Sequence, residues 1–437
     1  MERIYLKDLK EYYGKEVELQ GFVDNVRNLQ WVQFVVLRDN TGKVQITVEK
    51  NDENKGLNEI VNTLSCESTI KVKGKLLENE KVKLNGMELI PSEIIITSEC
   101  LEELPINFKD TESASLDTRL DNRFLDLRNE KNMLIFQIQS CLVEGMRDYL
   151  YKNKFIELHT PKIIGAASES GANVFEIKYY DRLAYLAQSP QFYKQMAMSS
   201  GMDRIFEVGP VFRAEKSYTS RHATEFTSFD LEMSYINSYE DVMETEANLL
   251  AYALSFVKER FGDKIKEVFK TEVVVPSLPF PKIDLHDLYK ELESRYGYQI
   301  PSEDAGDMNA EGEKLASKFA MEEYGSEFLF ITGYSASKRA FYHMRKNGVP
   351  EGFDLIWRGT EITTGAQREH RYDILKNQAE ERGLGEDVKF YLDFFKYGCP
   401  PHGGFAIGVD RLTMLLLDIP TIKEGMFLFR GPNRINP

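Results

Sequence analysis

Residues 206–233 read FEVGPVFRAEKSYTSRHATEFTSFDLEM, and this stretch decides how the rest of the chain is interpreted. Both ends have strand-like composition, whereas the middle is polar and contains Arg221 and His222. We therefore predict a β-hairpin whose strands are joined by a long charged loop. Arginine offers planar, bidentate donors for phosphate, and phenylalanine offers a face on which a base can stack. A solvated turn would account for the same residues about as well, so the hairpin alone leaves both interpretations open.

A glycine-rich segment further along the chain, residues 398–417, reads GCPPHGGFAIGVDRLTMLLL. Glycines at positions 403, 404 and 408 permit close backbone packing before an apolar helix. Arg411 falls near the start of that helix, where a cation and the helix N-terminus together favour an anion. A plain strand-to-helix packing junction is the alternative. The segment has neither GxGxxG nor GxxxxGK(S/T) spacing, so a Rossmann or P-loop nucleotide site is unsupported.

Closely spaced strand-like segments occupy the first hundred residues. They lie between residues 16 and 48 and again at 69–77 and 87–97, with a helix-like piece at 57–64. About five short strands and one helix predict a small β-barrel, an OB-fold, over residues 1–100. Residues 101–130 begin as a polar stretch and are predicted to be a linker or hinge.

The remainder, residues 131–437, is predicted to be a second domain with a small insertion around residues 270–350. Helical spacing of apolar residues is clear over 131–152, and strand-like and helix-like segments then mix without a regular βαβ repeat. This pattern favours an α+β domain built on an antiparallel sheet over a doubly wound fold.

Composition sets only broad limits. The net charge of −15 argues against a generally basic nucleic-acid coat protein, although a local basic surface can still bind RNA. Four cysteines lie far apart and none forms a CxxC pair, which favours reduced thiols in a cytoplasmic protein over a zinc or redox site. The first residues lack the apolar core of a signal peptide, and no apolar run approaches the roughly 20 residues of a membrane span.

Taken together, three segments resemble the signature motifs of the class II aminoacyl-tRNA synthetases. Residues 154–163, KFIELHTPKI, resemble motif 1 with its proline at Pro161, FRAE…RHATEF resembles motif 2, and GGFAIGVDR resembles motif 3. They occur in the family's order after an OB-like region, and the resemblance extends over roughly residues 15–437. Each motif alone is a moderate signal, whereas chance agreement of all three is improbable.

Two further segments resemble the amino-acid-specific parts of the aspartyl family. They are QSPQFYKQ at 188–195 and EITTGAQREHR at 361–371. Their cations fit the chemistry, because a buried site for an aspartate carboxylate needs positive partners and an asparagine amide would be mismatched with them. Lys194 and Arg368 would supply these charges. The alternatives are an exposed helix lysine and a surface salt bridge.

The resemblance implies a role for each matching position. Arg213 and Arg411 would be the catalytic residues. Aspartate would be bound by Glu169, Gln191, Phe192, Tyr193, Lys194, Arg213, Asp230, Thr364 and Arg368. ATP would be bound by Arg213, Glu215, Arg221, His222, Ala223, Phe226, Glu361, Gly408, Val409, Asp410 and Arg411. Mg²⁺ would be held by Glu361 and Thr364.

In the predicted barrel, Phe34 and Gln45 resemble the pair that reads the tRNA anticodon, one by stacking and the other by hydrogen bonding. Alternation along the strand would by itself place Phe34 in the core instead.

The implied partners are ATP, L-aspartate, tRNA-Asp and a second copy of the chain in a homodimer, with no membrane. Whether tRNA-Asn is also a substrate stays open, as do two related activities, an asparaginyl-tRNA synthetase and an asparagine synthetase-like amidoligase. The sequence departs from the family at Ala223, at SESG in residues 168–171, and in its last residues, FLFRGPNRINP. A non-catalytic relative would be expected to lose the motif arginines, which are all present.

Overall fold

The computed structural model describes residues 3–166, 173–216 and 219–437. The chain forms two compact units, Met1–Asn107 and Phe108–Pro437. Residues 108–130, part of the stretch expected to be a linker, pack within the second unit. Arg123, for example, is 1% exposed and donates hydrogen bonds to the main-chain oxygens of Glu424 at 2.7 Å and Met426 at 3.0 Å. Among the described residues, no helix is both long enough and apolar enough to cross a membrane.

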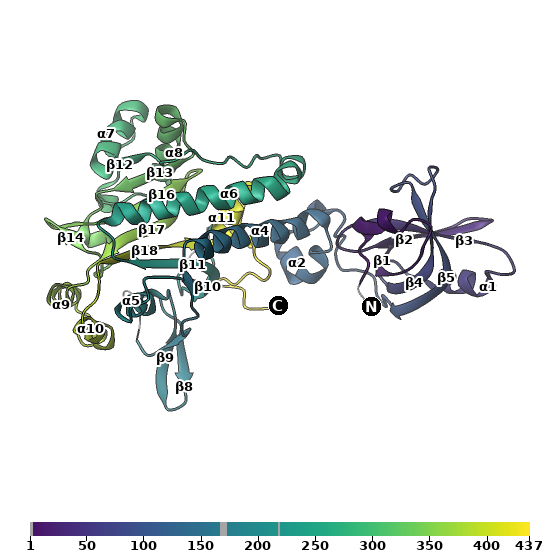
Figure 1. Cartoon of the computed structure of the whole chain (residues 1–437), viewed down its shortest axis with the longest axis horizontal. Helices are drawn as coiled ribbons and strands as arrows, with labels where there is room; N and C mark the ends of the chain where they lie inside the picture. Colours follow the sequence, from purple (N-terminus) through teal and green to yellow (C-terminus); the bar gives the residue numbers. More distant parts are fainter. Residues whose placement is uncertain (1–2, 167–172, 217–218) are drawn as a thin grey trace. The chain divides into compact units, whose positions relative to one another are not determined.

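The first unit is a closed barrel with the strand order β1-β2-β3-β5-β4 (Figure 1). Its strands are β1 (Glu16–Asn28), β2 (Val32–Arg38), β3 (Lys43–Glu49), β4 (Thr69–Glu78) and β5 (Met87–Ser98). The helix α1 (Lys55–Thr63) lies between β3 and β4, and the 3₁₀ helix η1 (Leu6–Tyr12) precedes β1. The predicted barrel is therefore present, and its helix occupies the expected place.

The side chains of β2 and β3 alternate between the barrel core and the outer surface. Val35 and Leu37 of β2 and Ile46 of β3 are fully buried, whereas Phe34 and Gln45 are only half-buried and lie on the outer face. Placing Phe34 in the core was therefore wrong. Alternation gives the period of a strand but not which of its two faces the core covers.

The second unit is built on an eight-stranded sheet with the order β12-β13-β16-β17-β18-β11-β10-β6. Its strands are β6 (Ile156–Glu157), β10 (Arg204–Phe212), β11 (Glu225–Ser234), β12 (Lys282–Asp284), β13 (Phe328–Thr332), β16 (Gly352–Trp357), β17 (Thr360–Arg368) and β18 (His402–Gly408). The strands pair antiparallel except at β10–β6 and β12–β13. This confirms the predicted α+β class, and β10 with β11 forms the predicted hairpin.

Helices flank this sheet (Figure 1). Their bounds are α2 (Leu116–Asp121), α3 (Arg123–Asp126), α4 (Glu130–Lys152), α5 (Gln191–Ser199), α6 (Tyr239–Phe269), α7 (Leu285–Tyr296), α8 (Ala310–Tyr324), α9 (Tyr372–Glu381), α10 (Lys389–Phe395) and α11 (Val409–Leu417). Short 3₁₀ helices are η2 (Thr111–Ser113), η3 (Ser302–Asp304), η4 (Ala336–Lys338) and η5 (Ile422–Gly425). Smaller sheets are formed by β7 (Ile163–Ile164), β8 (Glu176–Tyr179) and β9 (Arg182–Leu186), and by β14 (Arg345–Lys346) and β15 (Val349–Pro350).

The long helices α4 and α6 pack side by side and, with α11, cover one face of the sheet (Figure 1). The sequence of β11 explains how the sheet separates a core from a polar face. Phe229, Leu231 and Met233 point into the helix-covered core, whereas the alternate residues Asp230 and Glu232 point to the opposite face. The period of two thus buries apolar side chains on one face and collects charged ones on the other.

One carboxylic acid lies on the core side of the sheet. Glu246 of α6 is fully buried, and neither of its oxygens has a hydrogen-bond partner. Burial is the main cause that raises its pKa to about 8; the nearby Thr363 opposes the shift and the Asp354 carboxylate adds to it. Glu246 is therefore uncharged at neutral pH, as expected for a carboxyl group without a cationic partner in an apolar core.

Candidate active site

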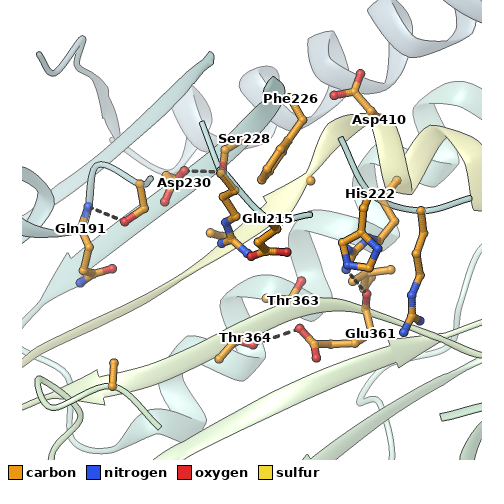
Figure 2. Close-up of a pocket in the computed structure, with 18 of the residues that line it drawn as sticks. Gln191, Glu215, His222, Phe226, Ser228, Asp230, Glu361, Thr363, Thr364 and Asp410 are labelled. Carbon is orange, nitrogen blue, oxygen red and sulfur yellow. Dashed lines mark hydrogen bonds between the residues drawn. The ribbon is translucent and has the colours of Figure 1, made fainter. Parts of the chain in front are cut away.

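A cavity of about 300 Å³ opens on the sheet face opposite α4 and α6. Its walls come from the middle strands β11, β17 and β18, the start of α5, the start of α11 and the loop that follows β10 (Figure 2). The predicted hairpin and the glycine-rich segment therefore meet at one site, because β18 pairs with β11 along their lengths.

Two cations and two carboxylates form a buried cluster beside this cavity, which we call the charge cluster: Lys194, Asp230, Glu232 and Arg368. All but Glu232 line the cavity itself. The Lys194 Nζ atom lies 3.0 Å from Asp230 Oδ1 and 3.4 Å from Glu232 Oε2. Arg368 Nε donates to Glu232 Oε1 at 2.9 Å. All four residues are at most 3% exposed, so Lys194 is not a surface lysine and Arg368 does not form a surface salt bridge.

The charges in this cluster stabilise one another. Burial alone would raise the pKa of Glu232, but Arg368 and Lys194 outweigh it and hold that pKa below its usual value. The pKa of Arg368 is raised, because the attraction of Glu232 outweighs the cost of burying the guanidinium. A ligand that enters the cavity therefore meets ionised groups at neutral pH.

Glu232 was missed by the sequence analysis, although a signal for it was present. In a strand, residues two apart share a face, and Ser228, Asp230 and Glu232 follow one another at that spacing. Ser228 Oγ donates to Asp230 Oδ2 at 2.5 Å, which fixes the carboxylate that lines the cavity.

Gly404 leaves the space that this cluster needs. A Cβ atom there would lie 2.0 Å from the main-chain oxygen of Leu231 and 2.4 Å from Glu232 Oε2. Its own carbonyl oxygen accepts a hydrogen bond from Arg368 Nη2 at 2.8 Å. The second glycine of the GGF sequence is thus required for close approach of backbone and buried charge.

Three arginines and a histidine surround the outer part of the cavity: Arg213, Arg221, Arg411 and His222. Arg213 follows β10 and is exposed, with its guanidinium carbon 5.5 Å from the centre of the Phe226 ring. Arg221 is held by an ion pair with Glu313 of α8 at 2.7 Å. Guanidinium groups gathered around a cavity with an aromatic side chain suit a ligand that combines phosphates with a base.

The same region lowers the pKa of His222. Burial is the largest cause and the Arg411 charge the next, while Glu215 opposes them. His222 is therefore neutral at pH 7 and can accept or donate a hydrogen bond without adding charge. Arg411 Nη1 donates to the main-chain oxygen of Glu361 at 2.9 Å, which aims the arginine across the cavity toward β17.

Among the predicted site residues, Glu361 is a carboxylate whose pKa is strongly raised. Its pKa is raised to about 7, first by burial and then by the Asp354 carboxylate, against the opposing charges of Arg411 and Arg339. Thr364 Oγ1 donates to Glu361 Oε1 at 3.2 Å, so a carboxylate and a hydroxyl lie together (Figure 2). No cluster of three or more metal-ligating His, Cys, Asp or Glu side chains occurs in the described parts of the chain. A hard cation here would need further oxygens from a ligand or from water, as Mg²⁺ commonly does.

Most of the predicted site residues line this one cavity. They are Gln191, Lys194, Arg213, Glu215, Arg221, His222, Ala223, Phe226, Asp230, Glu361, Thr364, Arg368, Gly408, Asp410 and Arg411. Glu169 lies outside the described residues. Phe34 and Gln45 belong to the barrel unit.

Three described residues predicted to bind aspartate or ATP do not line the cavity. Phe192 packs against Tyr391, with ring centres 4.1 Å apart, and Tyr193 follows it on α5. Gln191 and Lys194 are three residues apart and share the helix face toward the cavity, so the two residues between them point elsewhere. Val409, the first residue of α11, is 2% exposed and packs into the core.

Comparison with known proteins agrees with this geometry. Residues 115–429 match the tRNA synthetases class II (D, K and N), and residues 17–97 match the OB-fold nucleic acid binding domain. The aspartate–tRNA(Asp) ligase of Pyrococcus abyssi is 43% identical over 98% of each chain. The aspartate–tRNA(Asp/Asn) ligase of Aeropyrum pernix is 40% identical over 97% of this chain and 96% of its own.

A solved structure has the same fold over the whole length. Asparaginyl-tRNA synthetase from Pyrococcus horikoshii, complexed with asparaginyl-adenylate, superposes with a TM-score of 0.89 over 100% of both chains, at 31% identity. The resemblance seen in the three sequence motifs is thus confirmed along the full chain, which belongs to the class II tRNA synthetases (D, K and N).

Proposed function

We propose that this chain attaches L-aspartate to the 3′ end of tRNA, using ATP and passing through aspartyl-adenylate. The observation that carries the proposal is the buried pair of cations that line the cavity, Lys194 and Arg368. Relatives named as aspartate–tRNA ligases at 43% and 40% identity support the same substrate.

The charge cluster suits a zwitterionic amino acid with an extra carboxylate. Lys194 and Arg368 would hold the side-chain carboxylate, and Asp230 would take the ammonium group. Asp230 Oδ1 and Glu232 Oε2 have no hydrogen-bond partner, although the Lys194 ammonium lies within 4 Å of both. The Asp230 oxygen, whose residue lines the cavity, therefore retains capacity for a ligand. Aspartate would exchange one set of buried ion pairs for another, so no charge would be left uncompensated.

Arg213 would place the two reacting groups. It lines the same cavity as Lys194, Asp230 and Arg368, and its planar guanidinium can hold the α-phosphate of ATP and the α-carboxylate of aspartate together. The carboxylate oxygen would attack the α-phosphorus, forming a P–O bond as the bond to pyrophosphate breaks. The ribose hydroxyl of tRNA would then attack the acyl carbon and release AMP. Catalysis in this scheme is positioning and charge neutralisation, with no protein nucleophile.

The remaining ATP contacts follow from the outer cavity. Phe226 would stack on the adenine and Arg411 would cover its other face, with Glu215 at the edge of the base. Arg221 and His222 would meet the outer phosphates. Gly408, Ala223 and Asp410 form the adjoining wall. Asp410 also accepts from the main-chain nitrogen of Thr227 at 2.9 Å, which ties α11 to the strand that carries the charge cluster.

Mg²⁺ would be held by Glu361 and Thr364 together with ATP phosphates and water. The residues fit such an ion, because a hard cation prefers carboxylate and hydroxyl oxygens and would relieve the raised pKa of Glu361. When bound, it would neutralise charge on the phosphates.

Removing the Glu361 charge should therefore raise the demand for magnesium. In a Glu361→Gln variant we expect the Mg²⁺ concentration that half-activates aspartate-dependent pyrophosphate exchange to rise about tenfold or more. Thr364→Ser, which keeps the hydroxyl, is the matched control and should stay near wild type. An unchanged Mg²⁺ requirement in Glu361→Gln would remove this residue from the metal site.

The amino-acid assignment is tested by pyrophosphate exchange with aspartate and asparagine in parallel. Exchange should depend on aspartate, because asparagine would bring an ammonium group to Asp230, the present partner of Lys194, without bringing a side-chain carboxylate to replace it. We expect a preference for aspartate of at least about 10³-fold in kcat/KM, since a buried unpaired charge costs several kcal/mol. Exchange driven equally well by asparagine would overturn the assignment in favour of an asparaginyl enzyme.

The tRNA is tested by charging purified tRNA-Asp and tRNA-Asn side by side with aspartate. We propose tRNA-Asp as the substrate, and tRNA-Asn as a second substrate is the alternative that the Aeropyrum pernix relative favours. Transfer to neither RNA, with exchange intact, would instead point to an amidoligase that uses the adenylate on another acceptor.

We also propose a cytoplasmic homodimer. All four cysteines, Cys66, Cys100, Cys141 and Cys399, are free thiols, which fits a reducing compartment. The α4 helix of the motif 1 region, with α6, lines a groove of about 960 Å³ that includes Phe136, Tyr151 and Phe256. This partly apolar surface would lie between the two copies. A monomer in sedimentation at micromolar concentration would contradict the dimer.

A further inference from the structure

An exposed tryptophan distinguishes the turn between β1 and β2. The chain has two tryptophans. Trp357 is 1% exposed and stacks on Phe328, with ring centres 5.1 Å apart. Trp31, in contrast, is 73% exposed, and Leu29 beside it is 54% exposed. Two large apolar side chains therefore face solvent at one tip of the barrel unit, where leaving a flat aromatic ring in water serves no packing purpose.

This turn is held firmly in place. The main-chain nitrogen of Leu29 donates to Val32 O at 3.0 Å, and that of Lys50 donates to Trp31 O at 2.9 Å. Beneath the turn, Gln33 is fully buried and donates through its side chain to Asn62 Oδ1 of α1 at 2.8 Å. The tryptophan is thus presented by a rigid backbone, so a ligand that stacks on it would order few additional groups.

Trp31 lies at the edge of the face expected to meet nucleic acid. Direct cross-strand partners share a face, and Phe34 pairs with Arg27 on one side and with Thr47 on the other. Gln45 lies one step further along the same face, toward the start of β3. Trp31 lies just before β2, past the opposite end of that face. It is three residues from Phe34, which is roughly 10 Å along an extended strand at about 3.4 Å per residue.

An OB-fold binds single-stranded nucleic acid on its β2–β3 face and with the loop between its first two strands, which is where Trp31 lies. Such domains contact roughly 4–16 nucleotides, more than Phe34 and Gln45 could occupy. We infer that Trp31 is a second stacking platform beside Phe34, which binds an unpaired base of the tRNA anticodon loop beyond the bases at Phe34 and Gln45. This inference rests on the proposed function, because it takes tRNA as the partner.

The contact would be made by stacking and not by charge. Arg27 is an exposed cation on this part of the face and Lys50, next to Trp31, is a half-buried one, but Glu49 of β3 is exposed there as well. The surface around Trp31 is therefore not strongly basic. Stacking on an indole tolerates any base, so Trp31 would add affinity without reading a particular nucleotide.

Intrinsic fluorescence of the full chain tests the contact directly, since Trp357 is buried and Trp31 is not. An RNA hairpin with the anticodon stem and loop of tRNA-Asp should quench the emission and protect it from iodide. A minihelix with only the acceptor stem should do neither. In a Trp31→Ala variant, the remaining emission comes from the buried Trp357, and the hairpin should leave it almost unchanged. Quenching of wild type by the minihelix alone would overturn the inference.

Steady-state charging provides the energetic test. We expect Trp31→Ala to raise the KM for tRNA about tenfold with kcat unchanged, and Trp31→Phe to retain most of the affinity. Pyrophosphate exchange without tRNA should equal that of wild type, which separates a lost contact from misfolding. Tyr5→Ala, a 38% exposed aromatic residue of the same unit, is the matched control. The Trp31→Ala deficit should persist between 50 and about 200 mM salt, whereas total affinity falls steeply.

Abasic sites placed singly around the loop identify the base. One of them should weaken binding by wild type about as much as Trp31→Ala does, and should have no further effect in that variant. Additive effects at every position, or an unchanged KM in Trp31→Ala, would overturn the inference. If the chain fails to charge any tRNA, the proposed function fails, yet the fluorescence titration still reports whether Trp31 meets the loop. A concentration-dependent fluorescence change without RNA would instead assign Trp31 to self-association.

Discussion

Replacing Arg213 by alanine is expected to lower the rate of aspartate-dependent pyrophosphate exchange by about 10³-fold or more. Arg213 is an exposed guanidinium that lines the cavity, and the proposed scheme has no protein nucleophile or base to compensate for its loss. Charge develops at the α-phosphorus during adenylate formation, and removing one preorganised cation from such a site costs on the order of 4 kcal/mol. Rapid-quench or exchange assays at saturating ATP and aspartate measure this effect.

The loss should appear mainly in kcat. Arg213→Lys should recover only a small part, because an ammonium lacks the planar fork that can hold a phosphate and a carboxylate together. Arg182→Ala on β9, whose side chain is 76% exposed, serves as the matched control and should behave like wild type. Normal exchange by Arg213→Ala would refute the proposed role and, with it, the assignment of the cavity as the adenylation site.

Replacing Glu246 by glutamine is expected to have the largest effect on stability, and the effect should depend on pH. The pKa of Glu246 is about 8 in the folded chain, above its ordinary value of 4.5. Between these values the folded chain keeps a proton that the unfolded chain releases. The free energy of unfolding should therefore fall as pH rises through this window, by up to about 1.4 kcal/mol per pH unit.

Glutamine cannot ionise and has nearly the same shape, so it should remove this part of the pH dependence. At pH 5 the variant and wild type should be similar, whereas at pH 8 to 9 the variant should be more stable by several kcal/mol. Denaturation of the second unit, followed at a series of pH values, tests this. Glu244→Gln, an exposed neighbour on α6, should leave the pH profile unchanged. Parallel profiles of Glu246→Gln and wild type would show that Glu246 is not held neutral.

Local sequence was enough to find the segments that build the site. The hairpin at 206–233 and the glycine-rich junction at 398–417 each have a short-range signal, because strand composition, turn residues and glycine constraints act between neighbours in sequence. Lys194 and Arg368 were predicted for the same site through family resemblance, and both line the cavity.

The partners of these residues could not be predicted in the same way. Arg221 pairs with Glu313, which is 92 positions away, and Arg339 donates to Asp354, whose carboxylate helps to raise the pKa of Glu361. Such pairs depend on which strands become neighbours, and composition does not specify that. The core placement that alternation alone favoured for Phe34, the alternative to an anticodon contact, was wrong for a related reason, since alternation is symmetric between the two faces of a strand.

The position of β18 between β17 and β11 has a consequence for synthesis of the chain. Lys194 and Phe405, which meet beneath the cavity, are 211 positions apart. At roughly 5–20 residues per second, a ribosome needs about 10 to 40 seconds to pass from one to the other. For most of that time β11 waits with an unpaired edge, and β17 joins it only for the last few seconds, because roughly 34 residues separate β17 from β18. Open edges invite association with other nascent chains. β18 pairs with both strands and so covers both edges. A nascent chain whose translation stalls shortly before residue 402, where β18 begins, should therefore be especially prone to aggregation.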